Sequence, residues 1–310
     1  MGMRSHLAEI LGQHTALPVV LAESGAPIRP GMIAVARPGL HLLIHDDHVL
    51  LRRGPRENLA RPAIDSLFRT AACSRGGRVI GVVLSGSLND GTAGLMAIKR
   101  CGGLAVVQDP ADAAVPAMPL SALRHVDVDY RVPAADIGAT LLRLAVRPAA
   151  TTPDIPLDIR LEAMIATQEI ASMELEEKLG RLSPFTCPEC NGALWEIDDD
   201  IMLRFRCHVG HAFTAETILS ARAADVDKMI ETLLRSHVER AALARRLAEK
   251  ERSLKNNSLA TQFEARAREY DQDAEVMRRL ARHQWGGPAS AGGDTEGELL
   301  SNESADAHEP

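Results

Sequence analysis

A buried strand followed by a glycine-bounded loop and a helix constrains the fold of this chain more than any other feature. Residues 79–84 (Val-Ile-Gly-Val-Val-Leu) are apolar and largely β-branched, and the loop 86–91 (Gly-Ser-Leu-Asn-Asp-Gly) follows them. Residues 92–100 predict a helix and residues 104–107 a second strand, which together make a βαβ unit. Asp90 then lies at the carboxyl end of the first strand, where open parallel sheets gather ligands and catalytic groups. An Asn-Asp-Gly run is also a common turn, so the spacing alone leaves a purely structural role open.

Motifs on both sides of this loop carry a resemblance to a known family. Residues 61–68 (Arg-Pro-Ala-Ile-Asp-Ser-Leu-Phe) precede the loop, and the segments 108–110 (Gln-Asp-Pro) and 117–119 (Ala-Met-Pro) follow it. In this order they resemble the catalytic domain of the bacterial chemotaxis protein-glutamate methylesterases over roughly residues 5–135. The resemblance implies an α/β fold, a three-layer arrangement around a doubly wound parallel sheet. It also implies a protein substrate, the methylated chemoreceptor, from whose helices the enzyme removes glutamate methyl esters.

The resemblance assigns roles to two residues of the loop. The family uses a Ser-His-Asp triad, and its aspartate falls on Asp90, which would fix the histidine tautomer and stabilise the imidazolium. Ser87 falls where the family places a backbone amide that helps hold the oxyanion. The family usually has Met-Gly where this chain has Ser87-Leu88, but a backbone donor survives a change of side chain.

The nucleophile and base of that family have no counterpart in the sequence. Neither the Gly-x-Ser-x-Gly-Gly turn nor the histidine after the next strand is present. Ser5 and His6 are adjacent on a predicted helix, where neighbouring side chains point about 100° apart, so they do not replace the pair. We therefore expect little or no esterase activity from this chain as given, and we expect the true start to lie upstream. The competing hypothesis is a non-catalytic interaction or scaffold protein of a chemotaxis-like pathway.

Two cysteine turns form the second strong motif. Cys187 and Cys190 form a Cys-x₂-Cys turn, and after sixteen intervening residues Cys207 is followed by His208 and His211. Three thiolates and one histidine match tetrahedral zinc, so we predict a structural zinc ion held by Cys187, Cys190, Cys207 and His211. His208 is the competing fourth ligand, and its position directly beside Cys207 makes His211 the preferred one. A redox-active Cys-x₂-Cys or a disulfide is the alternative, which a reducing compartment disfavours.

Prolines, charge and apolar periodicity divide the chain into six segments. We predict a methylesterase-type domain over 1–147, a linker over 148–158, a connecting helix over 159–182, a zinc ribbon over 183–213, a helical hairpin over 214–285 and a disordered acidic tail over 286–310. Pro148, Pro153 and Pro156 indicate an extended tether, so the ribbon and hairpin should fold without the first domain. The hairpin is either a small bundle that packs on the ribbon or a surface for docking a signalling partner or for self-association.

Charge and hydropathy argue against several classes of partner. The formal net charge is −7, but residues 294–309 hold six carboxylates and no Lys or Arg, which leaves 35 basic against 36 acidic residues elsewhere. That balance offers no basic field for nucleic acid, and the 3% aromatic content disfavours base stacking by a zinc-ribbon nucleic-acid binder. No apolar run approaches about 18 residues. We therefore expect a cytoplasmic protein without membrane insertion.

Two further groups of ligand-type residues have simpler interpretations. His41, His45 and His48 lie along a predicted hairpin, where no thiol or carboxylate cluster supports a metal site, so surface or hydrogen-bonded histidines are the preferred reading. The run Asp198-Asp199-Asp200 could suggest calcium, but three adjacent carboxylates at a hairpin tip fit a solvated turn better.

Overall fold

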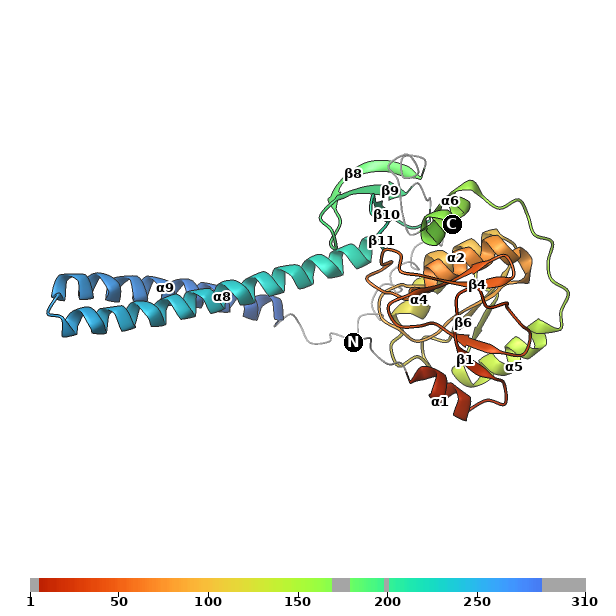
Figure 1. Ribbon diagram of the computed structural model, residues 1–310, viewed down its shortest axis with the longest axis horizontal. Helices are drawn as coiled ribbons and strands as arrows, with labels where there is room; N and C mark the ends of the chain where they lie inside the picture. The colour runs from red at the N-terminus through yellow and green to blue at the C-terminus, as the bar shows by residue number, and fades with distance from the viewer. Residues whose placement is uncertain (1–5, 169–178, 198–200, 286–310) are drawn as a thin grey trace, which may run out of the picture. The chain divides into compact units, whose positions relative to one another are not determined.

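The protein is described by a computed structural model covering residues 6–168, 179–197 and 201–285 (Figure 1). Its contacts divide the chain into two compact units, Met1–Arg222 and Ala223–Pro310. The predicted methylesterase-type domain and the predicted ribbon both fall within the first unit. The second unit holds most of the predicted helical hairpin.

A parallel sheet lies at the centre of the first unit. Its strands β5 (Ile80–Val83), β6 (Leu104–Gln108) and β7 (Tyr130–Val132) lie in that order, and Ile80 is in register with Leu104. The helix α3 (Thr92–Arg100) connects β5 to β6, as its apolar spacing predicts. Val83 of β5 and Val106 and Val107 of β6 are fully buried, which explains why these strands are continuously apolar. The predicted βαβ unit is therefore confirmed.

Helix α2 (Ile64–Arg75) packs closely against α3, which in turn contacts β5 and β6. A Cβ at Gly94 would lie 2.6 Å from the Phe68 Cβ and 2.9 Å from the Asp65 Cα, so only glycine allows the two helices to approach this closely. Two more helices, α4 (Ala117–His125) and α5 (Ala134–Ala145), contact the sheet at β6.

The amino-terminal part of the unit adds two smaller strand pairs. After α1 (Leu7–Gln13), β1 (Val19–Leu21) and β2 (Ile33–Val35) form a parallel pair, and β3 (His41–His45) and β4 (His48–Arg52) form the predicted antiparallel hairpin. Parallel strands alternating with helices confirm the mixed α/β content. The described strands lie in separate sheets, so one continuous three-layer arrangement stays a proposal.

The ribbon is a four-stranded antiparallel sheet. Its strands are β8 (Gly180–Thr186), β9 (Ala193–Ile197), β10 (Arg204–Cys207) and β11 (Ala212–Thr214), in the spatial order β11-β10-β9-β8. The predicted connecting helix over 159–182 is wrong for residues 180–182, which belong to β8 and pair with β9. Gly180 makes this pairing possible, because a Cβ there would lie 1.8 Å from the Glu196 carbonyl oxygen.

Three predicted segments fall partly or wholly outside the described residues: the rest of the connecting helix, the turn at residues 198–200 and the acidic tail. The helix α6 (Leu157–Gln168) confirms its first part, and residues 169–178 lie outside the described residues. The predicted calcium-or-turn segment at residues 198–200 and the predicted acidic tail at residues 286–310 also lie outside them.

The linker between the predicted domains is held against the first domain, which corrects the expectation that few contacts cross it. Thr152 Oγ1 accepts a hydrogen bond of 3.1 Å from the Gly77 amide in the short 3₁₀ helix η1 (Gly76–Arg78). Beyond the linker, Glu162 of α6 is buried among arginines from α2 and from the ribbon. Prolines predict an extended backbone, but they do not predict whether that backbone packs against the preceding domain.

Two long helices complete the chain. The helix α8 (Ala215–Ser253) continues from the first unit into the second, and α9 (Asn257–Trp285) follows after a short turn in which Lys255 has φ of +63°. This turn confirms the predicted break, and side-chain contacts such as Arg252–Glu264 and Arg240–Tyr270 show that the helices run antiparallel. In the described part of the chain, no helix combines the length and apolarity that a membrane crossing requires.

Candidate functional site at the Asp90 loop and the cysteine cluster

Asp90 sits where the βαβ reasoning places it, after the carboxyl end of β5. Its two carboxylate oxygens accept hydrogen bonds from the first backbone amides of α2, 2.8 Å from Ile64 and 3.1 Å from Asp65. Gly91 follows with φ of +92°, which lets the chain turn directly into α3. The carboxylate thus binds the amino end of α2, where unpaired amides favour a negative charge.

Asp65 makes the reciprocal contact from α2 to α3. Its Oδ1 accepts a hydrogen bond of 2.7 Å from the Gly94 amide, and its Oδ2 accepts one of 2.9 Å from the Asn58 side chain. Burial, followed by the negative charge of Asp65, raises the pKa of Asp90 to about 7. Burial also raises the pKa of Asp65 to about 6. Both carboxyl groups therefore hold their protons to a higher pH than an exposed aspartate.

Ser87 lies exposed in the same loop. The loop is anchored beside it, because the Gly86 amide donates to the Val115 carbonyl at 2.9 Å and the Gly86 carbonyl accepts from the Met118 amide at 3.0 Å. Among the hydrogen bonds of the described residues, none uses the Ser87 amide. That donor is available to a ligand, which is what the predicted oxyanion role requires.

In the described part of the chain no histidine is hydrogen-bonded to Asp90. A buried serine–histidine pair does occur nearby, with 3.0 Å between Ser66 Oγ and His41 Nδ1. The second ring nitrogen of His41 donates to the Pro55 carbonyl at 2.8 Å, and burial lowers the His41 pKa. With His41 2% exposed and Ser66 fully buried, this pair is structural and cannot reach a protein substrate. His45 and His48 face each other across the hairpin as exposed residues.

The ribbon contacts the loop at the residue before Asp90. Asn89 donates from Nδ2 to Thr214 Oγ1 at the end of β11 and to Glu216 Oε2 at 3.1 Å, and its Oδ1 accepts a hydrogen bond of 3.1 Å from Thr217. Asn58 joins the same network, because its Oδ1 accepts the Thr214 amide at 3.2 Å. Asn58, Asn89, Thr214 and Thr217 are buried and Glu216 is exposed at the edge, so the contact is a packed interface.

Buried ion pairs reinforce this interface. Glu162 of α6 binds Arg204 and Arg206 of β10, each at 2.8 Å, and Arg69 of α2 pairs with Glu57. Burial alone would raise the pKa of Glu162, but the positive charges of Arg204, Arg69 and Arg206 hold that pKa well below its usual range. The network joins helix α2, helix α6 and the ribbon, and the sequence patterns of the separate segments did not reveal it.

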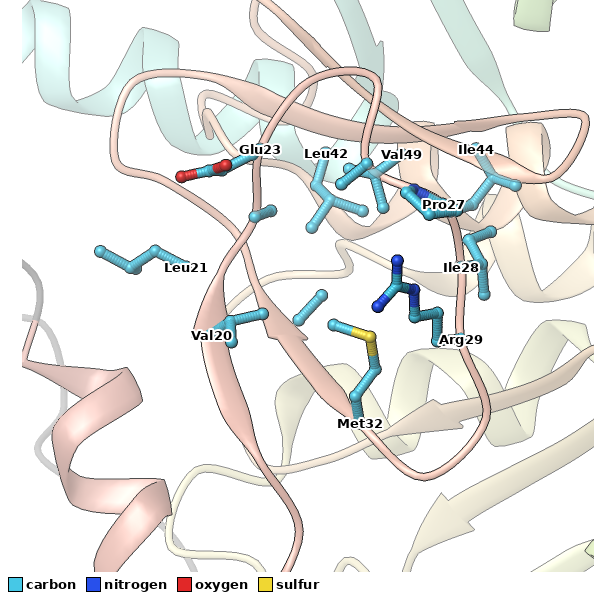
Figure 2. Close-up of a pocket in the computed structure, with 13 residues that line it drawn as sticks. Val20, Leu21, Glu23, Pro27, Ile28, Arg29, Met32, Leu42, Ile44 and Val49 are labelled. Atoms are coloured by element: carbon cyan, nitrogen blue, oxygen red, sulfur yellow. The ribbon is translucent and has the colours of Figure 1, made fainter.

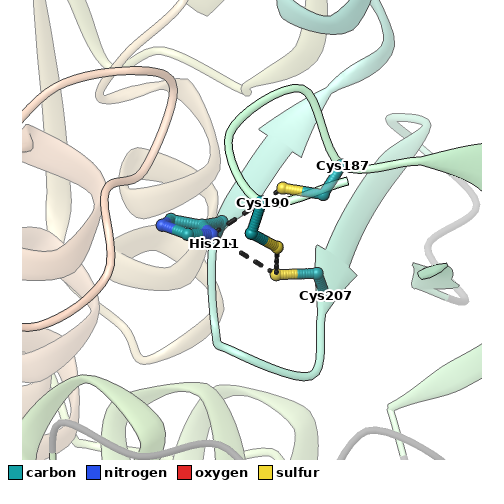
Figure 3. Close-up of side chains that lie close together, drawn as sticks. All are labelled: Cys187, Cys190, Cys207 and His211. Carbon is teal, nitrogen blue, oxygen red and sulfur yellow. Dashed lines mark hydrogen bonds between the residues drawn. The ribbon is translucent and has the colours of Figure 1, made fainter. Parts of the chain in front are cut away.

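The predicted zinc ligands converge in the ribbon (Figure 3). The ligand atoms of Cys187, Cys190, Cys207 and His211 all lie within 4.8 Å of one another. His211 Nδ1 is 3.5 Å from the Cys207 sulfur and 3.7 Å from the Cys187 sulfur, and 3.7 Å separates the sulfurs of Cys190 and Cys207. Ligands about 2.3 Å from a tetrahedral zinc ion lie about 3.7 Å from one another, so these four residues could hold such an ion. The sulfur separations also show that no disulfide joins these cysteines.

A glutamate inside the first cysteine turn supports the histidine. Glu189 Oε2 lies 3.3 Å from His211 Nε2, the ring nitrogen that faces away from the sulfurs, and Glu189 Oε1 accepts from Arg56 at 3.1 Å. A carboxylate on the distal nitrogen of a metal-binding histidine fixes its tautomer and raises its basicity. His208 is not a member of the cluster; its ring lies against Gly192 instead. The acidic residue between the cysteines was the sequence signal for Glu189, and sequence reasoning missed it.

An apolar pocket of about 440 Å³ lies apart from these residues, between the β1–β2 pair and the β3–β4 hairpin (Figure 2). Its walls include Val20, Met32 and Leu42, and the Arg29 guanidinium points into it. None of its lining residues belongs to the Asp90 loop or to the cysteine cluster.

Comparison with known proteins finds relatives for the amino-terminal half of the chain. A family model described as CheB methylesterase matches residues 1–141. A putative protein-glutamate methylesterase/protein-glutamine glutaminase of Leptospira interrogans is 44% identical over 124 residues, which cover 40% of this chain and 64% of that protein. Protein-glutamate methylesterase FrzG of Myxococcus xanthus is 37% identical over 143 residues, covering 46% of this chain and 43% of the relative.

A solved structure, the CheB methylesterase catalytic domain of Thermotoga maritima, matches with 30% identity and a TM-score of 0.44, covering 46% of this chain and 80% of that one. The chain spans less than two thirds of the length of the two curated relatives named above. The cysteine cluster and the hairpin lie beyond the residues that the family model matches.

Proposed function

Because residues 1–141 form a CheB methylesterase family domain, we propose that they carry the aspartate arm of a protein-glutamate methylesterase site. The observation that carries the proposal is the position of Asp90, partly buried after β5 and oriented by two amides of α2. A carboxylate accepts about four hydrogen bonds, so Asp90 keeps capacity for a histidine N–H. In this role it would hold the histidine tautomer and stabilise the imidazolium formed during acyl transfer.

The proposed reaction is hydrolysis of glutamate methyl esters on a methylated chemoreceptor. A serine attacks the ester carbonyl, a histidine takes the serine proton and returns it to the departing methanol, and water then releases the glutamate. The Ser87 amide would donate to the oxyanion, which is consistent with its exposed, unoccupied donor. The proposal places the protein in the cytoplasm, with a receptor as substrate and with neither nucleic acid nor membrane insertion involved.

We also propose that Cys187, Cys190, Cys207 and His211 hold a structural zinc ion. Four protein ligands fill a tetrahedral site completely, so the ion would support the fold and leave no position for substrate. Glu189 and Arg56 would orient His211, and the ion would tie the two cysteine turns together. The near-tetrahedral spacing of the ligand atoms supports this assignment.

Methanol release from methylated receptor tests the catalytic role of Asp90. The assay compares the 310-residue chain with the same chain preceded by the in-frame translation of the upstream DNA. We expect release only from a polypeptide that contains the serine turn and the histidine, and a loss on the order of 10⁴-fold in kcat for Asp90→Asn in that polypeptide. The matched control is Asp109→Asn, which removes a carboxylate after the neighbouring strand β6. Equal activity of Asp90→Asn and the unsubstituted protein would contradict the proposal.

A second candidate function is a non-catalytic interaction or scaffold protein that works through the ribbon and the hairpin. The lack of a histidine on Asp90 in the described residues favours it, as does the long hairpin with its exposed leucines. The same assay separates the two functions, because a scaffold releases no methanol with or without the upstream translation.

A further inference from the structure

The hairpin of the second unit has a core with strict heptad spacing. Seven residues of α8, at alternating intervals of four and three, face α9. Seven residues of α9 with the same kind of spacing face α8, and all fourteen are buried or half-buried. They are Ile230, Leu234, His237, Ala241, Ala244, Ala248 and Glu251 on α8 and Ala260, Phe263, Ala267, Tyr270, Ala274, Met277 and Ala281 on α9. Alanine fills much of this seam, so the two helices bury little apolar area between them.

The two flanks of this core differ in chemistry. One flank is closed by ion pairs between the helices, Arg245 with Asp271 and Arg252 with Glu264. We call the opposite flank the leucine flank. It consists of exposed residues spaced seven apart: Leu233, Arg240 and Leu247 on α8, Leu254 directly after its end, and Leu259, Arg266, Asp273 and Leu280 on α9. Its five leucines are each 39–54% exposed, a large apolar exposure for one face of a two-helix unit.

The leucine flank has a self-complementary order. Along α8 and the residue after it, Leu233 and Leu254 are equally distant from a midpoint at 243–244. On α9, Leu259 and Leu280 are equally distant from a midpoint at 269–270. The contacts Arg240–Tyr270 and Arg245–Asp271 place these two midpoints side by side in the hairpin. One twofold axis through both midpoints therefore places Leu233 against Leu254 of a second copy and Leu259 against Leu280 of that copy.

That axis also pairs the charges of the flank. It places Arg266 of one copy on Asp273 of the other, twice by symmetry, and it places the aliphatic stem of Arg240 on Leu247. Asp273 is 54% exposed and contacts only His237, at 3.4 Å, among the ion pairs of the described residues. On α9, Arg266 and Asp273 of the two copies thus meet between the leucine pairs at the two ends of the flank.

We propose that the hairpin binds a second copy of this chain through the leucine flank, in an antiparallel four-helix bundle. A twofold interface needs one surface that complements itself, and the flank meets that condition in both its leucines and its charges. A partner with a different sequence would require no such internal symmetry. Burial of the leucines would supply the apolar core that the alanine seam lacks.

Sedimentation velocity of the full-length protein, over a range of concentrations, tests this assembly. We expect a dimer for the unsubstituted chain and a monomer for Leu233→Glu and for Leu280→Glu, each of which buries a charge against a leucine of the other copy. The control is Val238→Glu, which places the same charge on an exposed residue of α8 outside the leucine flank and should remain dimeric. Circular dichroism should show equal helicity in all three variants. A monomer at every concentration, or a dimer that survives both leucine substitutions, overturns the proposal.

A charge swap tests the antiparallel register. Arg266→Glu or Asp273→Arg alone should weaken the dimer at least tenfold, because like charges would face each other across the axis. The double variant Arg266→Glu/Asp273→Arg should restore dimerisation. Failure of the double variant to recover, with helicity intact, would rule out the proposed pairing of the two copies.

Discussion

Asp90 is the residue on which the chemistry depends, and its environment makes its charge conditional on pH. Burial and the neighbouring Asp65 raise its pKa to about 7. The unfolded chain would give Asp90 a pKa of about 3.9. The native protein therefore binds more protons than the unfolded chain between these values. This contribution to stability is fully present below pH 4 and is lost as the pH rises through about 7.

Asp90→Asn should accordingly change the pH dependence of stability. At pH 5 the variant should be less stable by about 1–3 kcal/mol, because an amide oxygen replaces only one of the two acceptors used by the α2 amides. The deficit should shrink towards pH 8, where ionised Asp90 destabilises the unsubstituted protein. Urea unfolding at pH 5, 6, 7 and 8 measures this.

Asp109→Asn is the control for that series. A hydrogen bond from Arg131 lowers the pKa of Asp109, so its contribution is complete by pH 5 and its variant should show a constant difference up to pH 8. Parallel curves for Asp90→Asn and Asp109→Asn would show that the Asp90 carboxyl does not have a raised pKa.

Glu189 should determine how tightly the cysteine cluster holds metal. It contacts the distal nitrogen of His211, and loss of such a partner typically lowers metal affinity about 10–100-fold. Glu189→Gln should show this loss when zinc is titrated against a competing chelator. Glu196→Gln, which removes the carboxylate that pairs with exposed Arg181 in the same ribbon, should leave the affinity unchanged. A stoichiometry near zero in the unsubstituted protein would instead reject the zinc site.

At the scale of elements, the sequence predicts what depends on local spacing. The βαβ unit follows from its β-branched runs and glycine loop, the hairpin helices from their apolar intervals, and the cysteine cluster from its two short turns. The strand at residues 180–182 was missed because its partner, β9, fixes its conformation through backbone pairing. The Glu162 network was missed because its members lie on α2, α6 and β10, and no interval in the sequence relates them.

Glu162→Gln tests the energetic weight of that network. The substitution removes the carboxylate that binds Arg204 and Arg206 and leaves buried guanidinium groups underpaired, which costs about 3–5 kcal/mol. Asp158→Asn on the same helix breaks a partly exposed pair with Arg100 and should cost less than about 1 kcal/mol. Denaturant unfolding compares the two, and equal small losses would mean that the network does not hold the ribbon in place.

At the scale of the molecule, residues 1–222 behave as one unit, and this changes the meaning of the ribbon. Proline spacing predicts a ribbon that folds independently of the first domain. The structure instead places Thr214 and Thr217 on Asn89, beside the proposed catalytic carboxylate. A ribbon isolated from residues 1–157 would expose this polar face and lose Arg69 as a neighbour of Glu162. The ribbon is therefore part of the framework around the Asp90 loop.

Hydrogen exchange with and without a zinc chelator tests this central claim most directly. Stability is local, so loss of the ion should raise exchange wherever the ribbon supports its neighbours. We predict faster exchange in the ribbon and also in residues 56–65 and 86–94 of the full-length protein. The helix α5 at residues 134–145 should be unaffected. Faster exchange confined to the ribbon would contradict the account, because it would show that the Asp90 loop does not depend on the metal-holding sheet.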